Sequence, residues 1–205
     1  MPPISFQLAQ AFDHGRHALD LARTLGDERM LALAMDSLAV AAAFIGDFTT
    51  LDEIGPQLNA IHRRHSDLWY LQFALYQWCY VPIGQGRWDD AIAQLEEVLA
   101  INRRIGDRGN EPLYASTLCW VHVSRGAYAH AFENGRLAVS RSEELGNTES
   151  LGWNAGCFGW ALLETYALEE AAQLLERGRE AAALDDAAMR QGFLHAARSQ
   201  LGEGL

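Results

Sequence analysis

Residues 86–105 decide the fold, and they read GRWDDAIAQLEEVLAINRRI. Apolar residues recur in this stretch at three- and four-residue steps, which is the spacing of one apolar face on an amphipathic helix. Its acidic residues come early and its Arg residues come late, an order that complements the helix dipole. We therefore predict a helix from Trp88 to Ile105 that follows a turn at Gly86.

This stretch belongs to a pattern that returns every 40 residues. One series at that step is Gly46, Gly86 and Gly126, and a second is Asp27, Asp67, Asp107 and Asn147. A third is Ala11, Ala91, Ala131 and Ala171, with Leu51 in place of Ala in the second copy. Three series that share one step predict a tandem array of helix pairs, so the expected fold class is all-α with about eight to nine helices.

The array is expected to form a single domain over residues 1–205. Its units are a half repeat at 6–27, four pairs at 28–67, 68–107, 108–147 and 148–185, and a terminal helix at 186–202. The Asp and Asn series falls where helices should start, because short oxygen-bearing side chains cap free backbone N–H groups. Neither end is a dedicated cap, which suggests a piece of a longer protein or an array that continues into a partner copy.

Three prolines modify the expected helices. Pro112 moves the start of its helix to Asn110 or Glu111, because proline is tolerated only in the first turn. Pro56 predicts that its helix is kinked or begins late, and Pro82 predicts that its helix is shortened.

Composition excludes several classes of partner. The net charge of −11 opposes binding to phosphate backbones and anionic lipids, so no nucleic-acid or membrane-surface partner is expected. No apolar run reaches the ~20 residues of a membrane span and no signal peptide opens the chain, so the expected location is cytoplasmic. The cysteines, Cys79, Cys119 and Cys157, have no close partner in sequence and are expected to be buried, reduced thiols.

No motif for catalysis is present. The chain has no GxSxG elbow, phosphate loop, HExxH or dinucleotide fingerprint, and it has no Lys for a Schiff base, so it is not expected to be an enzyme or to hold a cofactor. Two histidine pairs at a three-residue step, His14 with His17 and His62 with His65, lack the further ligands that zinc requires, so no metal site is expected.

Two segments carry a family resemblance. Residues 86–92, GRWDDAI, and residues 126–132, GAYAHAF, resemble the Gly-x-aromatic-x-x-Ala core of the tetratricopeptide repeat (TPR), and a weaker copy lies at 166–171. The resemblance implies a right-handed α-solenoid of antiparallel helix pairs in which the first helix of each pair lines a concave surface. The usual repeat has about 34 residues, and longer units resemble those in the sensor arrays of large bacterial signalling regulators.

The resemblance also suggests a binding groove. The helical phase of each first helix places eight residues on or near the inner wall: Asp36, Phe73, Tyr76, Tyr80, Trp120, Trp153, Asn154 and Trp160. Aromatic rings offer large contact area at small entropic cost, which suits a peptide or a flat ligand. The alternative is that these rings fill the space between helices. Trp78, Trp88 and Tyr128 match repeat-core positions and are assigned no function.

Three hypotheses of function follow. The first is a scaffolding module that binds a protein or peptide segment in the aromatic groove. The second is a sensor array in which the same groove binds a small molecule and signals to an attached output domain. The third is a self-association unit that forms a homo-oligomer through its terminal helices.

Overall fold

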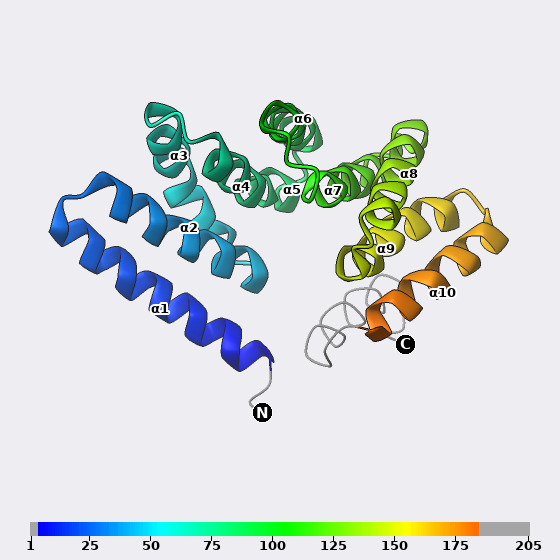
Figure 1. Cartoon of the computed structure of the whole chain (residues 1–205), viewed down its shortest axis with the longest axis horizontal. Helices are drawn as coiled ribbons and strands as arrows, with labels where there is room; N and C mark the ends of the chain where they lie inside the picture. The colour runs from blue at the N-terminus through cyan, green and yellow to red at the C-terminus, as the bar shows by residue number, and fades with distance from the viewer. Residues whose placement is uncertain (1–3, 185–205) are drawn as a thin grey trace. The chain divides into compact units, whose positions relative to one another are not determined.

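The computed structural model describes residues 4–184, and all regular secondary structure in that range is α-helical (Figure 1). The helices are α1 Ile4–Leu25, α2 Glu28–Ile45, α3 Phe48–Arg64, α4 Leu68–Trp78, α5 Tyr80–Gly84, α6 Trp88–Ile105, α7 Glu111–Ser124, α8 Tyr128–Leu145, α9 Thr148–Glu164 and α10 Leu168–Leu184. The predicted all-α class is confirmed. The terminal helix expected at 186–202 lies outside the described residues.

The chain separates into two compact units, one up to Gly106 and one from Asp107. In the first unit, α1 packs on α2, α2 on α3 and α4, and α4 on α6. In the second unit, α7 packs on α8 and α9, and α9 packs on α8 and α10. We call α2, α4, α7 and α9 the A-type helices and α1, α3, α6, α8 and α10 the B-type helices.

The repeated Gly series forms the turns between helices. Six glycines, Gly26, Gly46, Gly86, Gly106, Gly126 and Gly146, have φ between +62° and +77°, a region that residues with a Cβ rarely adopt. Gly46 ends α2 in this conformation, and its backbone N–H donates to the carbonyl of Ala43. Ser66 and Tyr166, where the 40-residue step would place a glycine, have the same conformation, with φ of +54° and +60°.

The predicted caps form at three of the four positions. The side chains of Asp27, Asp67 and Asn147 each accept from a backbone N–H in the first turn of the following helix. Asp107 differs because α7 begins only at Glu111, with Pro112 in its first turn. There the Asp107 carboxylate accepts from the Gly109 N–H instead, which closes the turn before the helix.

The other two prolines act differently from each other. The late start expected for the Pro56 helix is wrong, because α3 begins at Phe48 and continues through Pro56 to Arg64. Pro82 shortens its helix as predicted. Since it has no N–H to donate to the Trp78 carbonyl, α4 ends at Trp78 and α5 resumes at Tyr80.

Large side chains on A-type helices fit against glycines on the preceding B-type helices. A Cβ added to Gly55 of α3 would lie 2.5 Å from Trp78, and one added to Gly135 of α8 would lie 2.5 Å from Phe158. Gly15 of α1 faces Leu38 in the same way, with a Cβ 3.1 Å from its backbone. The contact recurs at the repeat step and sets how closely successive helices approach.

Each unit has its own apolar core. In the first, the buried cluster includes Leu19, Met35, Leu51 and Leu58, and in the second it includes Cys119, Phe158, Leu162 and Leu174. All three cysteines are buried free thiols, as predicted, and burial raises the pKa of Cys119 to about 12. Within residues 4–184, no helix has the length and apolar character needed to cross a membrane.

Candidate functional site

The A-type helices, together with the short α5, present two rows of apolar side chains that follow the repeat step. The first row contains the residues at positions 33, 73, 113 and 153, and the second contains those at positions 40, 80, 120 and 160. We call these eight residues the apolar rows: Leu33, Phe73, Leu113, Trp153, Val40, Tyr80, Trp120 and Trp160. None of them is charged. Five of the eight predicted groove residues belong to these rows.

In the first unit, the apolar rows lie on neighbouring helices α2 and α4 and continue into α5. Leu33 and Val40 are 42% and 41% exposed, and Phe44, one turn after Val40, is 70% exposed. On α4, Phe73 is half-buried and meets the exposed ring of Trp69 edge to face, with centroids 5.4 Å apart. The aliphatic members Leu33 and Val40 were not among the predicted groove residues, because the predicted apolar members were all aromatic. The repeat step from Phe73 and Tyr80 leads directly to Leu33 and Val40.

Tyr76 and Tyr80 form a tyrosine pair across the break between α4 and α5. Their hydroxyl oxygens are 2.8 Å apart, and their rings meet edge to face with centroids 5.6 Å apart. Tyr76 is only 4% exposed, whereas Tyr80 is half-buried beside the core. Tyr76 therefore supports the surface from beneath, and Tyr80 lies at its edge.

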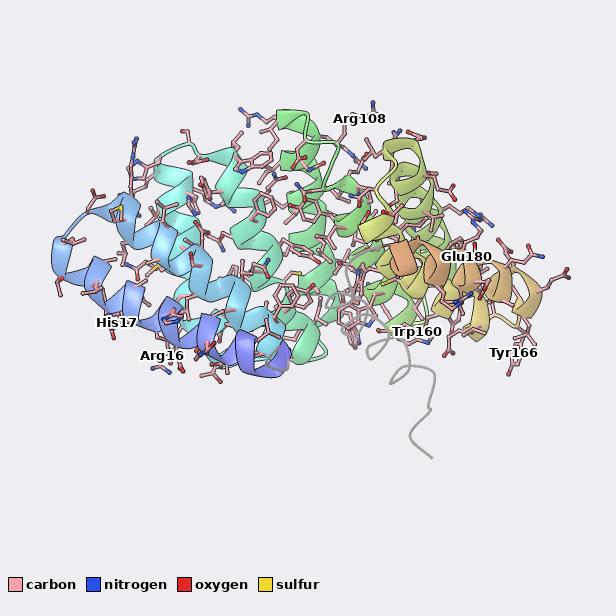
Figure 2. The ribbon with its side chains drawn as sticks, turned by 60° about the horizontal axis from the view of Figure 1, so that its bottom comes forward. Arg16, His17, Arg108, Trp160, Tyr166 and Glu180 are labelled. Atoms are coloured by element: carbon pink, nitrogen blue, oxygen red, sulfur yellow. The ribbon has the colours of Figure 1, made fainter. Side chains whose placement is uncertain are left out.

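In the second unit, the apolar rows bring two tryptophans together. Trp120 of α7 and Trp153 of α9 are both half-buried and meet edge to face, with centroids 6.4 Å apart. Trp160 of α9 is also half-buried (Figure 2). Its indole N–H donates to the Glu164 carboxylate at 2.9 Å. All three rings are partly accessible, and tryptophans are common among the residues that dominate binding surfaces.

The two polar residues predicted for the groove bond to B-type helices. Asp36 of α2 is half-buried, and its carboxylate lies 3.0 Å from Nε2 of the buried His62 on α3. Asn154 of α9 is fully buried, and its amide donates to the Ser142 hydroxyl of α8 at 2.7 Å. His62 and Ser142 occupy the same repeat position. Both side chains thus join neighbouring helices inside the structure.

Two opposing effects act on the pKa of the Asp36 carboxyl. Burial raises the pKa of this carboxyl, and the hydrogen bond with His62 acts in the opposite direction. The His62 ring also stacks on Tyr70, with centroids 5.5 Å apart and planes at 12°. Asp36, His62 and Tyr70 therefore link α2, α3 and α4 through one polar contact and one stacked contact.

His65, the second histidine of the predicted pair His62 and His65, also has a carboxylate partner from another helix. His65 Nε2 lies 2.9 Å from the carboxylate of Glu28 on α2, which also pairs with Arg64. The partner carboxylates, Asp36 for His62 and Glu28 for His65, could not be predicted from sequence spacing, because both lie on the preceding helix α2. In the part of the chain that the structure describes, no three His, Cys, Asp or Glu side chains are grouped to hold a metal ion.

Charged residues of the B-type helices pair with one another at the surface. Arg63 of α3 lies 2.7 Å from Glu97 of α6, and Arg177 of α10 pairs with Glu143 of α8. These partners are about half exposed, so each pair contributes little to stability. Neither of these two pairs includes a residue of the apolar rows.

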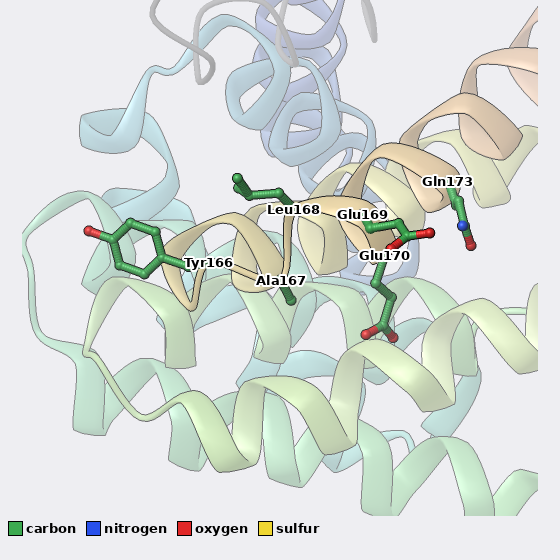
Figure 3. A pocket seen from close by; sticks show the side chains of 6 residues that line it. All are labelled: Tyr166, Ala167, Leu168, Glu169, Glu170 and Gln173. Atoms are coloured by element: carbon green, nitrogen blue, oxygen red, sulfur yellow. The ribbon is translucent and has the colours of Figure 1, made fainter.

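A shallow hollow at the start of α10 offers a weaker site. It is lined by Tyr166, Leu168, Glu169, Glu170 and neighbouring residues, and the Tyr166 ring points away from the two carboxylates (Figure 3). Tyr166 is 86% exposed. Because its side chains do not converge on a common point, the hollow lacks the arrangement of a ligand site.

Solved structures with the same architecture are TPR-like repeat proteins. BtubC (BKLC) from P. vanneervenii matches with a TM-score of 0.71 and 16% identity over 96% of this chain and 85% of that one. A kinesin light chain protein from Podosopora anserina, with nearly identical TPR-like repeats, matches with a TM-score of 0.64 and 20% identity over 87% of this chain and 89% of that one. A variant of it gives a TM-score of 0.66 at 20% identity, over 87% of this chain and 88% of that one.

At these identities the likeness establishes the fold alone, and it confirms the TPR-type repeat that residues 86–92 and 126–132 predicted. Neither a protein-family model nor a curated protein matches the sequence.

Proposed function

We propose that this chain, which has a TPR-type repeat fold, is a non-catalytic scaffolding module that holds an apolar protein segment against the apolar rows. TPR-like folds generally act as protein-interaction or scaffold modules and offer extended surfaces for partner chains. The observation that carries the proposal is the set of uncharged apolar side chains that recurs at the repeat step, as residues 33, 73, 113 and 153 and residues 40, 80, 120 and 160.

Exposure in the first unit supports a binding surface over simple packing. An apolar side chain that only fills space between helices should be covered by its neighbours. Leu33, Val40 and Phe44 are instead between 41% and 70% exposed. Three large apolar side chains exposed on one face of α2 form a patch of the kind that marks interaction sites. Their spacing places them along one stripe of the helix.

The chemistry of the surface specifies the partner. The apolar rows contain no charged side chain, so a charged residue in the bound segment would lose water without gaining an opposite charge. Apolar and aromatic side chains in the segment would instead bury area against Phe73, Trp120 and Trp153. The partner is therefore a protein segment rich in apolar residues and poor in charge where it contacts the A-type helices.

Selection from a random-peptide display library tests this function. Peptides enriched on the full chain should be apolar. Leu33→Ser with Phe44→Ser should weaken the binding of peptides to the first unit at least about tenfold, or ~1.4 kcal/mol. Trp120→Ala with Trp153→Ala should abolish binding to the second unit with helicity and melting temperature nearly intact. Tyr166→Ala, which removes an exposed aromatic ring outside the rows, serves as the control and should bind normally.

Two outcomes would reject the proposal. One is the absence of enriched peptides, and the other is binding that both double variants leave unchanged. Native mass spectrometry of protein isolated from its host separates the rival functions. A retained small molecule would favour a sensor that uses the same surface, a second copy would favour self-association, and a retained peptide would support the proposal.

A further inference from the structure

The face of α1 that contains Ala11, Ala18 and Leu21 is uncovered. All three side chains are exposed, and Leu21 is 53% exposed. The residues that follow Ala11 and Ala18 at the repeat step on other B-type helices are at most 1% exposed: Leu51, Ala91, Ala131 and Ala171 at the first position, and Leu58, Val98 and Ala138 at the second. α1 therefore presents to solvent a face that the fold elsewhere packs against a neighbouring helix.

Two histidines lie on this side of α1. His14 is one turn from both Ala11 and Ala18, and its ring is exposed. His17 is one turn from Leu21 and is exposed at the outer surface of α1 (Figure 2). Residues three apart on a helix have Cβ atoms about 5–6 Å from each other, so the two imidazoles can bind one metal ion.

The position of His17 is used for contact between helices elsewhere in the fold. Glu97, two repeat steps further on, pairs with Arg63 of α3. Arg177, four steps further on, pairs with Glu143 of α8. On α1, a position that elsewhere reaches another B-type helix is thus occupied by a side chain that can ligate a metal.

We propose that His14 and His17 of two copies of this chain hold one zinc ion between two α1 helices. Zinc in proteins normally takes four ligands in a tetrahedron, and imidazole nitrogens are common among them. One chain offers two ligands here, and no three His, Cys, Asp or Glu side chains among the described residues are grouped to hold a metal ion. A second copy related by a two-fold axis supplies the other two ligands, so the site is complete only in the dimer.

The spacing of the exposed residues of α1 suits this arrangement. Residues 11, 14, 18, 21 and 25 are all exposed and follow alternating three- and four-residue steps, the spacing of a seam between two helices. In an antiparallel pair whose two-fold axis passes beside residues 14–17, Leu21 of each copy lies opposite Ala11 of the other. Because a large side chain then meets a small one, the helices can approach to the usual 8–10 Å, about the separation that a bridging ion requires.

The metal ion is needed because the contact through α1 is small. A stable interface buries more than about 1,000 Å². Among the described side chains of the seam, only Leu21 and Leu25 are large and apolar. Each copy also carries a net charge of −11, so two copies repel each other. Zinc supplies both bonds across the contact and positive charge, and the carboxylate of Asp13, four residues before His17, adds negative charge beside the ion.

Sedimentation velocity of the full chain tests the proposal. After treatment with EDTA, the protein should be a monomer of 22.7 kDa. One zinc ion for every two chains should convert it to a dimer, and further EDTA should reverse the change. Magnesium, which prefers oxygen ligands in an octahedron, should leave the mass unchanged.

Substitutions locate the site. His14→Ala and His17→Ala should each raise the zinc concentration needed for half-maximal dimerisation at least about tenfold, because each removes two of the four ligands. Leu21→Arg should also prevent dimerisation, since it places like charges across the contact, and circular dichroism should show unchanged helicity at this exposed position. His130→Ala, which removes an exposed histidine of α8, is the matched control and should dimerise normally.

Three results would overturn the proposal. The first is a full chain that remains monomeric when zinc is added. The second is a dimer that persists in EDTA or in the double variant His14→Ala with His17→Ala, because another surface would then join the copies. The third is an equal loss of dimerisation in His130→Ala, which would place the zinc ion elsewhere. A second copy bound at α1 uses no residue of the apolar rows, so peptide binding tests the scaffold function separately.

Discussion

Single residues decide how tightly the helices can turn. The repeat uses glycine for the left-handed turns, but Ser66 and Tyr166 hold the same conformation with a Cβ present. For a bulky residue this conformation costs roughly 1 kcal/mol, because Cβ crowds the following carbonyl oxygen. The strain at Tyr166 is not offset by burial, since its side chain is 86% exposed at the α9–α10 turn.

Replacement of Tyr166 by glycine should therefore stabilise the second unit. We expect Tyr166→Gly to raise the free energy of unfolding by about 0.5–1 kcal/mol, measured by urea denaturation. Tyr166→Ala retains the Cβ and should give much less of this gain. Equal effects of the two substitutions would show that the ring, rather than the backbone conformation, governs stability there.

A buried histidine makes stability depend on pH. His122 of α7 is 8% exposed, its ring lies 5.2 Å from that of His130, and its Nδ1 has no hydrogen-bond partner in the described range. Burial, reinforced by the positive charges that His130 and Arg125 carry when protonated, lowers the pKa of His122 below its usual value of 6.5. The unfolded chain therefore takes up this proton at a higher pH than the folded protein does.

The sign of the effect follows from proton linkage. The contribution of His122 to stability should be present above about pH 6.5 and should be lost as the pH falls towards its folded pKa. His122→Phe should make the melting temperature less sensitive to pH between about 7 and 5. If the wild type and His122→Phe show the same slope in that window, the histidine is not a source of acid sensitivity.

At the scale of helices, small residues control how closely neighbours pack. Gly178 of α10 faces α9, and a Cβ added there would lie 2.6 Å from the Cβ of Ala155. Gly156, also on α9, has no atom within 4 Å of the place where a Cβ would be. Two helical glycines close together in the fold thus have opposite surroundings.

Alanine at these two positions should have opposite effects. Gly178→Ala should destabilise the second unit by about 1–3 kcal/mol, because the Ala155 Cβ cannot rotate out of the way. Gly156→Ala should stabilise it by up to about 1 kcal/mol through helix propensity alone. Thermal unfolding of both variants measures the difference, and destabilisation by both would mean that α9 is less accessible at Gly156 than the structure indicates.

The helices themselves could be predicted because their signals are local. The signals are the three- and four-residue spacing of apolar side chains in Trp88–Ile105, and the capping side chains of Asp27, Asp67 and Asn147. The start of α7 likewise follows from Pro112 in its first turn. The break at Cys79 was anticipated as a shortening, since Pro82 affects only the carbonyl four residues before it. Of the two alternatives stated for the Pro56 helix, the late start is wrong, because α3 begins at Phe48 and tolerates one absent hydrogen bond at Pro56.

Contacts between helices were much harder to predict. Asp36 and Asn154 were expected near a groove, and their partners on B-type helices, His62 and Ser142, could not be foreseen. Sequence periodicity indicates the face of a helix on which a residue lies, but it does not fix which side chain of a neighbouring helix it meets. The buried side chain of Asn59 could not be foreseen either, because only the packed structure shows that no described neighbour bonds to it.

Across the described residues, uncharged and charged side chains occupy different places. The apolar rows contain no charged side chain, whereas ion pairs such as Arg63 with Glu97 and Arg177 with Glu143 join neighbouring B-type helices. The net charge of −11 keeps the molecule repelled from other anions. This division is the physical basis for the proposal that an apolar protein segment binds the A-type helices.

Hydrogen exchange of the full chain, with and without a peptide selected from the display library, shows which helices the peptide covers. We expect the peptide to slow exchange in α2, α4, α7 or α9, and Leu33→Ser with Phe44→Ser to remove the protection in the first unit. Protection confined to the B-type helices α3, α6, α8 and α10 would contradict it.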